Sequence, residues 1–323
     1  MSAMLEVHDL RLEFKTSRGN LKALNGITFT VQAGEVFGLV GETGCGKTVT
    51  GLSVLRLLPR SALITGGQVL FEGTDLLRLP QSQIESMRGS KIAMIFQDPS
   101  TSLNPVFTVG SQIERVVRQH MPVTRGQARE KTLSVLSAVG LPDVERIMGS
   151  YPHQLSGGMQ QRVMIAMALS CNPRLLIADE PTTALDVTIQ AQILKLLRDL
   201  QRKFDLSIIL ITHNLGIIAQ TCDRLAVLYG GRVAEAGPTR EIFNHPQHPY
   251  TRGLMSAIPN AEARGKKMAT IPGTVPSNPG AMTGCTFAPR CAFVMERCTV
   301  ETPPLYPLGG NHASACFLAE AGK

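Results

Sequence analysis

The sequence predicts an α/β protein in which helices cover a parallel sheet. Three short apolar runs have the length of buried strands, and each is bounded by polar residues or glycine: 36–40 (VFGLV), 175–178 (LLIA) and 208–211 (IILI). Between the last two runs, apolar residues recur at helical spacing behind Asp186, a suitable N-cap; they are Ile189, Ile193, Leu196, Leu197 and Leu200. This strand–helix–strand order is typical of parallel sheets.

Two further regions depart from this pattern. Residues from about 98 to 160 show helical patterns near 113–119 and 127–139 and no convincing buried strand, which predicts a helical subdomain inside an α/β domain of residues 1–240. Ten of the twenty prolines fall in 241–323. We therefore expect this last segment to be a loop-rich extension, and such a segment usually needs a staple to hold one conformation.

Composition restricts the class of protein. Hydrophobic residues make up 43 %, which supports a buried core. No apolar run reaches the ~18–20 residues that span a bilayer, and the N-terminus lacks a signal-peptide core, so we expect a cytosolic protein. The net charge of +7 suits an anionic membrane face or a nucleic acid. Because the basic residues are scattered and aromatic residues reach only 5 %, we expect no nucleic-acid partner.

The turn after the first strand matches the phosphate-binding pattern G-x-x-x-x-G-K-[ST]. Glycines let backbone N–H groups surround phosphates, and the following helix adds its positive dipole end. Lys47 should bridge the β- and γ-phosphates of ATP, and the Thr48 hydroxyl should bind Mg²⁺. The alternative is a glycine-rich turn without a ligand. The expected contacts are Gly41, Glu42, Thr43, Gly44, Cys45, Gly46, Lys47 and Thr48. We expect Cys45 to be a small filler in this loop; a thiol at a helix start can have a lowered pKa, but we do not expect oxidative inhibition here.

A pair of carboxylates follows the second strand. Asp179 lies where a strand ends beside the phosphate loop, so its carboxylate can hold Mg²⁺ directly or through water. Glu180 lies one residue further on, where it can polarise the water that attacks the γ-phosphate. The alternative is an acidic strand end at a surface turn. Together with the phosphate loop, the pair predicts a P-loop ATPase.

A second anion-binding helix start is expected at LSGGMQQR, residues 155–162. Ser156 is suited to cap this helix, and Gly157 and Gly158 leave its backbone N–H groups open to an anion. The phosphate loop is already expected to bind one nucleotide. The second anion-binding helix start is therefore best explained by contact with ATP that is bound to another subunit.

At this point the sequence resembles the ABC ATPase family, whose LSGGQ signature it matches except for Met159. The resemblance covers about residues 5–240 and implies a P-loop, RecA-like ABC ATPase core. It implies that Phe14 stacks on adenine, although a core Phe is nearly as plausible there. It further implies a Q-loop glutamine at Gln97 that contacts Mg²⁺ and the attacking water, a signature contact at Gln160, a D-loop at 184–186 with Asp186, and a switch histidine at His213 that holds the γ-phosphate.

The family mechanism implies particular partners. Two ATP molecules would join two such subunits head to tail, and hydrolysis through Glu180 would release them and drive two transmembrane permease subunits between access states. The resemblance therefore implies a second ABC ATPase subunit, a related heterodimer partner by this likeness, and a position at the cytoplasmic face of the membrane.

The extension narrows the resemblance further. The stretches FNHPQHPYT (243–251) and IPGTVPS (271–277) resemble the tails of ATPases that serve oligopeptide, dipeptide and nickel importers. This likeness implies uptake of peptides or a similar small solute from an extracytoplasmic binding protein. The rival class is a non-transport ABC ATPase acting on DNA or ribosomes. Such proteins carry long coiled-coil insertions or tandem cassettes, and this sequence has neither.

Four cysteines crowd into the extension: Cys285, Cys291, Cys298 and Cys316. Four thiolates suit zinc or an iron–sulfur cluster, and free thiols are the third possibility. The resemblance favours a [4Fe–4S] cluster, because relatives with this tail pattern carry one. Structural zinc usually shows Cys pairs two to four residues apart, and the extension has none.

Overall fold

The computed structural model describes residues 3–17, 19–183, 185–257, 271–276 and 278–322, and the chain forms two compact units. One unit holds residues 33–36 and 79–211. The other holds residues 2–32, 37–78 and 212–323. Parallel strands covered by helices occur in both, which confirms the predicted α/β class. The domain boundaries expected from the sequence at 98, 160 and 240 stay a prediction.

The first unit, which we call the carboxylate unit, is built on three parallel strands. They are β6 (Ile92–Ile95), β7 (Leu175–Asp179) and β8 (Ser207–Thr212), with β7 in the centre. Every residue of β7 and β8 is buried, as expected of strands covered on both faces. Helix α8 (Val187–Phe204) links β7 to β8 and buries Ile193, Leu197 and Leu200, as its periodicity predicted.

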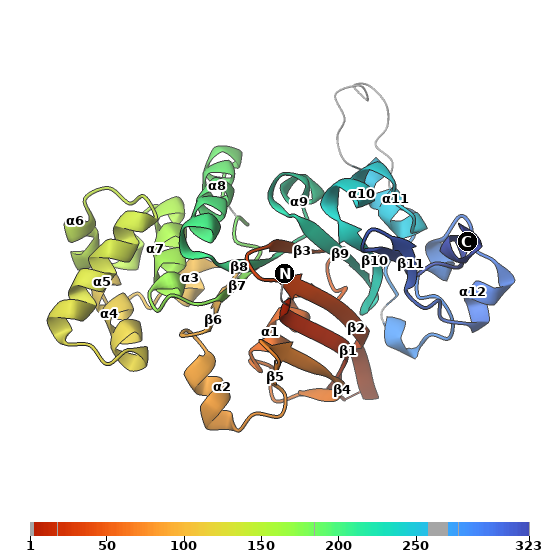
Figure 1. The fold of residues 1–323 in the computed structure, drawn as a ribbon, viewed down its shortest axis with the longest axis horizontal. Helices are drawn as coiled ribbons and strands as arrows, with labels where there is room; N and C mark the ends of the chain where they lie inside the picture. The colour runs from red at the N-terminus through yellow and green to blue at the C-terminus, as the bar shows by residue number, and fades with distance from the viewer. Residues whose placement is uncertain (1–2, 18, 184, 258–270, 277, 323) are drawn as a thin grey trace. The chain divides into compact units, whose positions relative to one another are not determined.

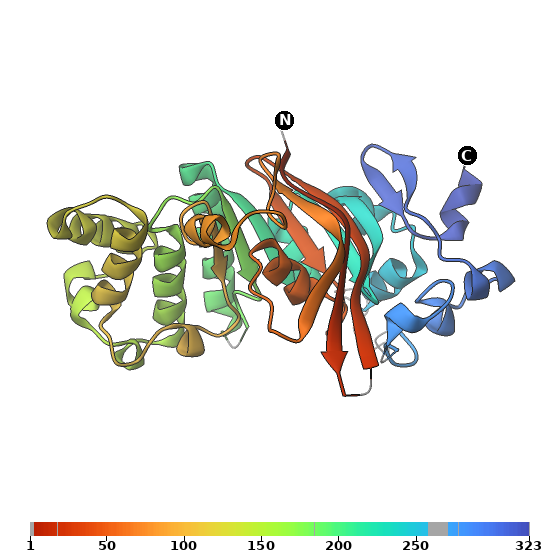
Figure 2. The ribbon, with the colours of Figure 1, turned by 90° about the horizontal axis from the view of Figure 1, so that it is seen from below.

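Helices occupy the middle of this unit's sequence. They are α2 (Gln81–Met87), α3 (Pro99–Ser102), α4 (Val109–His120), α5 (Arg125–Ala138), α6 (Val144–Gly149) and α7 (Gly157–Leu169). Two of them, α4 and α5, lie where the sequence showed helical patterns. Figures 1 and 2 show α4 and α5 beside α7, and α6 packs on α4 and α5. Thr108 caps α4 and Thr124 caps α5, the latter with a capping box to Gln127.

The second unit, which we call the loop unit, contains two sheets. Its antiparallel sheet has the order β2 (Gly19–Gln32), β1 (Ala3–Thr16), β4 (Ala62–Phe71) and β5 (Thr74–Asp75), and Figure 1 shows the first three side by side. Burial along β1 changes phase between Val7 and Leu10, where Asp9 adopts a φ of 46° and the register shifts. This irregularity keeps Leu5 and Leu12 on the same buried face although they lie seven residues apart.

The other sheet carries the phosphate loop. Strand β3 (Val36–Val40) pairs in parallel with β9 (Arg224–Tyr229), which pairs antiparallel with β10 (Arg232–Pro238). Helix α1 (Lys47–Val54) follows the loop, and α9 (Leu215–Thr221) precedes β9. In the part of the chain described, no helix has both the length and the apolar character needed to cross a bilayer.

The extension has short helices and strands between its loops. It contains α10 (Thr239–Asn244), α11 (Pro249–Ser256), α12 (Glu296–Val300), short 3₁₀ turns and the strands β11 (Tyr306–Gly309) and β12 (His312–Ser314). The prolines do not prevent α11, because Pro249 occupies its first turn, where no N–H is needed. Strand β12 pairs with β10, so the extension continues the sheet.

Candidate functional site

The phosphate loop of the loop unit closes around the Lys47 side chain. Lys47 is 6 % exposed, and its Nζ donates to the carbonyl oxygens of Gly41 at 2.8 Å and Glu42 at 3.0 Å. Gly41 adopts a φ of 154°, and a Cβ at this position would lie 2.2 Å from the carbonyl oxygen of Leu228. Only glycine fits here, because the opposing atom is backbone and cannot rotate away. The exposed residues of the loop are Thr43, Gly44 and Thr48.

Cys45 lies in the same loop and is buried. Burial raises the pKa of its thiol, and the nearby Lys47 offsets this only in part. The pKa is therefore not lowered at this helix start, because desolvation of the thiolate outweighs the effect of the lysine charge.

The predicted switch histidine lies beside this loop. His213 is exposed on the turn between β8 and α9. The next residue, Asn214, caps the N-terminus of α9: its side chain accepts from the Gly216 N–H at 2.9 Å. A pocket brings His213 together with the phosphate loop and α11; it is lined by Val40, Gly41, Glu42, Thr43, His213, Leu215 and Leu254. Phe14 is half-buried on β1 opposite Leu21 and Ala62, and its contact with adenine stays a prediction.

The carboxylate unit brings Glu180 and Gln97 together, although 83 residues separate them. The Gln97 amide donates to Oε2 of Glu180 at 3.3 Å, and the Thr183 hydroxyl donates to the same oxygen at 2.9 Å. Glu180 has a φ of 46°, and its N–H donates to the carbonyl of Ile211. Asp179 ends β7 and is only 4 % exposed. The sequence did not point to Thr183, because a lone Thr in a turn carries no local signal.

Helix α7 begins as predicted at an exposed serine cap. Ser156 Oγ accepts from the N–H of Met159 at 3.4 Å. A Cβ on Gly157 would meet only ordinary contacts, whereas a Cβ on Gly158 would lie 2.9 Å from Cγ2 of Ile189 on α8. Gly158 is thus required for the packing of two helices as well as for an open helix start.

Two other predicted ligand contacts have partners inside their own unit. The Gln160 amide donates to the carbonyls of Pro152 at 2.9 Å and Leu155 at 3.1 Å, so it holds the turn that precedes α7. Asp186 caps α8, as expected. A nucleotide contact by either side chain stays a prediction, and Ala184 of the expected D-loop lies outside the described residues.

The extension contacts the phosphate loop through residues that the sequence analysis missed. The N–H of Glu42 donates to Oη of Tyr250 on α11 at 3.0 Å. The Glu42 carboxylate accepts two hydrogen bonds from the Arg290 guanidinium, from Nη1 at 2.6 Å and from Nη2 at 3.1 Å. No sequence spacing could have indicated this contact, because 248 residues separate the two side chains.

A buried carboxylate on β10 fixes the start of α11. Glu235 accepts from the backbone N–H groups of Gln247 at 2.8 Å and His248 at 2.9 Å, and pairs with His312 Nε2 at 2.7 Å. Burial alone would raise the pKa of Glu235, but these hydrogen bonds together lower it. Burial lowers the pKa of His248 from 6.5 to about 4. The neutral His248 ring accepts from the Tyr250 N–H at 3.0 Å.

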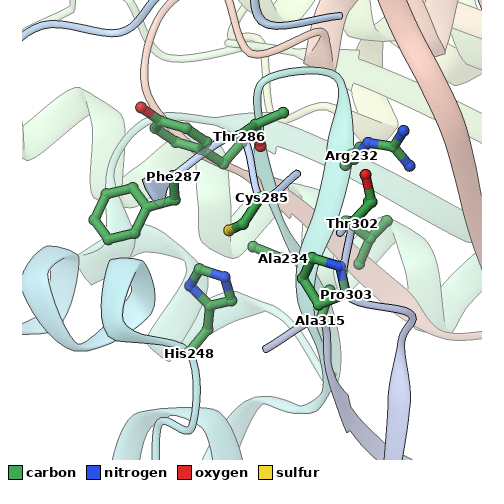
Figure 3. Close-up of a pocket in the computed structure, with 11 residues that line it drawn as sticks. Arg232, Ala234, His248, Cys285, Thr286, Phe287, Thr302, Pro303 and Ala315 are labelled. Atoms are coloured by element: carbon green, nitrogen blue, oxygen red, sulfur yellow. The ribbon is translucent and has the colours of Figure 1, made fainter. Parts of the chain in front are cut away.

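The four cysteines of the extension line one pocket. Apolar residues that include Phe287 and Phe293 complete its wall. Burial raises the pKa of Cys285 to about 11, and the other three thiols add to the rise. An adjoining pocket shares Cys285, and Figure 3 shows this residue between His248, Phe287 and Ala234. In the described part of the chain, no group of three or more His, Cys, Asp or Glu side chains is placed so that it could hold a metal ion.

Comparisons with known proteins identify the family of this chain. Residues 24–183 match the family model for ABC transporters, and residues 234–298 match that for the C-terminal region of oligopeptide/dipeptide transporters. The dipeptide transport ATP-binding protein DppD of Bacillus subtilis is 47 % identical over 99 % of this chain and 96 % of its own length. The oligopeptide transport ATP-binding protein OppD of Salmonella typhimurium is 47 % identical over 98 % and 94 %.

Solved structures of ABC cassettes have a similar fold. The ATP-binding cassette MJ0796, in a dimeric post-hydrolysis state bound to ADP and Pi, superposes with a TM-score of 0.66 at 26 % identity, over 73 % of this chain and 99 % of that chain. The cbiO1 cassette of Clostridium perfringens, part of the complex cbiONQ, gives a TM-score of 0.66 at 29 % identity over 76 % and 92 %.

Proposed function

Because this chain belongs to the ATP-hydrolysing subunits of the ABC transporter family, in the oligopeptide/dipeptide group, we propose that it drives the import of di- and oligopeptides. The observation that carries this proposal is similarity along nearly the whole chain, extension included, to relatives whose names state dipeptide and oligopeptide transport. Import of nickel or another small solute is the alternative, since no described residue identifies the cargo.

The site residues fall into complementary roles in ATP hydrolysis. Lys47 and the backbone N–H groups of its loop would hold the phosphates, as a glycine-rich helix start does. Glu180 would polarise the attacking water, and Gln97, which already donates to that carboxylate, would orient it. His213, which shares a pocket with the phosphate loop, would hold the γ-phosphate.

Magnesium is the metal that we propose beside ATP, on the chemistry of three side chains. Asp179 supplies a buried carboxylate at a strand end and Thr48 a hydroxyl in the first turn of α1, which are the ligand types that Mg²⁺ prefers. When bound, Mg²⁺ neutralises negative charge on the phosphates. The Gln97 amide would add a third oxygen.

The exposed start of α7 supports a shared nucleotide site. Ser156 and Gly157 leave a capped helix N-terminus open, and it would complete ATP bound by a second ATPase subunit, for which a related heterodimer partner is proposed. Two transmembrane permease subunits and an extracytoplasmic solute-binding protein would complete the importer. This chain would then lie peripherally at the cytoplasmic face of the membrane.

We propose a [4Fe–4S] cluster as a structural cofactor of the extension; the described thiols line one pocket but are not placed to hold a metal ion, so they would have to come closer together around it. Its support is the gathering of Cys285, Cys291, Cys298 and Cys316 at one pocket, since four thiolates are the usual ligands of such a cluster. The cluster would supply a covalent staple for the extension. Protein purified without oxygen should be brown and absorb near ~400 nm, and stoichiometric zinc without iron would reject this cofactor.

The test of the transport function is reconstitution with the neighbouring permease subunits in lipid vesicles. Adding a binding protein loaded with peptide should stimulate ATP hydrolysis, and the same binding protein with nickel should not. Stimulation by nickel alone would favour the other importer class. Co-purification with ribosomes or DNA, without permease subunits, would refute transport.

A further inference from the structure

Glu42 places a negative charge inside a loop that binds a polyanion. Its backbone is already committed, because its carbonyl accepts from Lys47 at 3.0 Å and its N–H donates to Tyr250 at 3.0 Å. Glu42 belongs to the eight-residue loop itself, and at physiological salt charges interact over ~8–10 Å, so its carboxylate can act on phosphates held by this loop. Left unpaired, this carboxylate would repel the phosphates of ATP.

Arg290 cancels that charge. Its guanidinium meets the Glu42 carboxylate through two parallel hydrogen bonds, at 2.6 Å and 3.1 Å, and its side chain is only 5 % exposed. Bidentate pairs of this kind are directional and strong, and the arginine of this one is shielded from solvent, whereas the Glu42 side chain is 28 % exposed. It therefore differs from the exposed ion pairs of the extension.

The Arg290 guanidinium is held in place by further hydrogen bonds. Its other three N–H donors are used as well: Nε to the carbonyl of Pro272 at 2.9 Å, Nη2 to that of Ile271 at 3.3 Å, and Nη1 to Oη of Tyr229 at 3.4 Å. All five guanidinium donors thus have acceptors. The position of the charge is fixed by the extension and by β9, and not by the phosphate loop alone.

The backbone of Arg290 is held by the cysteine pocket. The Arg290 N–H donates to the Phe287 carbonyl at 2.9 Å, and the turn begins where the Ala288 N–H donates to Cys285 at 3.0 Å. Cys291 follows directly in sequence. The ring of Phe287 also packs on Tyr250, with centroids 5.4 Å apart. A change in the cysteine pocket therefore reaches Glu42 through short, packed connections.

We propose that Arg290 is a positioning residue for ATP: it neutralises Glu42 within the phosphate loop, and the extension thereby sets the affinity for the nucleotide. The inference rests on ATP binding at this loop and not on the cargo. If the pair had a purely structural role, removing either partner would weaken ATP binding by the same factor. If Arg290 neutralises Glu42, the two removals have unequal effects on ATP binding. Only the loss of Arg290 leaves an unpaired negative charge in the phosphate loop.

The test is calorimetric titration of the full chain with Mg–ATP, for Arg290→Gln, Glu42→Gln and the double variant. We expect Arg290→Gln to raise Kd at least about tenfold above Glu42→Gln, as loss of a charge-assisted contact would. The double variant should bind more tightly than Arg290→Gln alone. Equal Kd values for the two single variants, or no recovery in the double variant, would overturn the proposal.

Arg297→Gln is the matched control. Arg297 lies in the same extension but is 45 % exposed, and its ion pairs, to Glu301 and Glu320, stay within the extension. Its loss should leave Kd unchanged, and a rise equal to that of Arg290→Gln would overturn the proposal. If Arg290→Gln does not fold, Arg290→Lys replaces it. Because Lys keeps the charge but not the fork, Kd should rise less than about fivefold, and a larger rise would refute neutralisation.

In the reconstituted transporter, the same variants separate binding from chemistry. Arg290→Gln should raise KM for ATP with little change in kcat. The reason is that the lost interaction stabilises bound ATP equally in the ground state and in the transition state. A fall in kcat at unchanged KM would contradict a positioning role. Lack of peptide-stimulated turnover in the wild type would instead count against the peptide-import proposal, and would leave the calorimetric result intact.

Discussion

Acid should loosen the part of the extension that holds α11, because His248 is neutral in the folded protein. Its pKa is lowered from 6.5 to about 4. Above pH 6.5 the ring is neutral in both the folded and the unfolded chain. Between pH 6.5 and 4 only the unfolded chain binds the proton, so stability falls as pH falls. Below pH 4 both states are protonated and the difference stays constant.

The size of the effect follows from the same shift. At pH 5 the linkage relation gives a loss of about 2 kcal/mol relative to pH 7.5. Glu235 does not obscure this measurement. Its pKa is lowered in the folded state, so the stability that it contributes is lost only as pH falls below its ordinary value of 4.5.

The assay is urea unfolding at pH 7.5 and pH 5, followed by tyrosine fluorescence. The chain has four tyrosines and no tryptophan; Tyr250 belongs to α11, and the Tyr229 ring packs against it. His248→Gln replaces the titrating ring with a neutral side chain. The wild type should lose about 2 kcal/mol between the two pH values, and the variant should lose clearly less. Equal losses in both proteins would refute the assignment to His248.

Three substitutions test the site itself. Glu180→Gln should slow ATP hydrolysis by about 10²–10⁴-fold while ATP still binds, as expected for loss of a general base; normal phosphate release with the partner present would refute the role. Gly41→Ala would put a Cβ 2.2 Å from the Leu228 carbonyl, so Mg–ATP titration should detect no binding, and binding like that of the wild type would show that the loop tolerates the change. Gly158→Ala would bring a Cβ to 2.9 Å from Ile189 and should reduce turnover, with partial recovery when Ile189→Ala is added; no recovery would show that the clash is not the cause.

The sequence alone determined the architecture around the nucleotide. Apolar runs of strand length predicted β3, β7 and β8, because a strand buried on both faces must be apolar throughout. The glycines after β3 predicted a phosphate loop, since only glycine allows the required backbone. Ser156 and Asp186 predicted helix starts that the structure confirms. Each of these signals is local, so neighbouring residues suffice to express it.

Tertiary structure alone decided which distant groups meet. The Gln97–Glu180 contact joins the ends of two strands, and the Arg290–Glu42 pair joins the extension to the phosphate loop. Burial also raised the pKa of the Cys45 thiol. Such contacts and desolvation depend on how separate elements pack, and chain spacing does not encode them. Hydrophobic pattern and backbone freedom fix the elements, whereas charge pairing and pKa values are set only once those elements have packed.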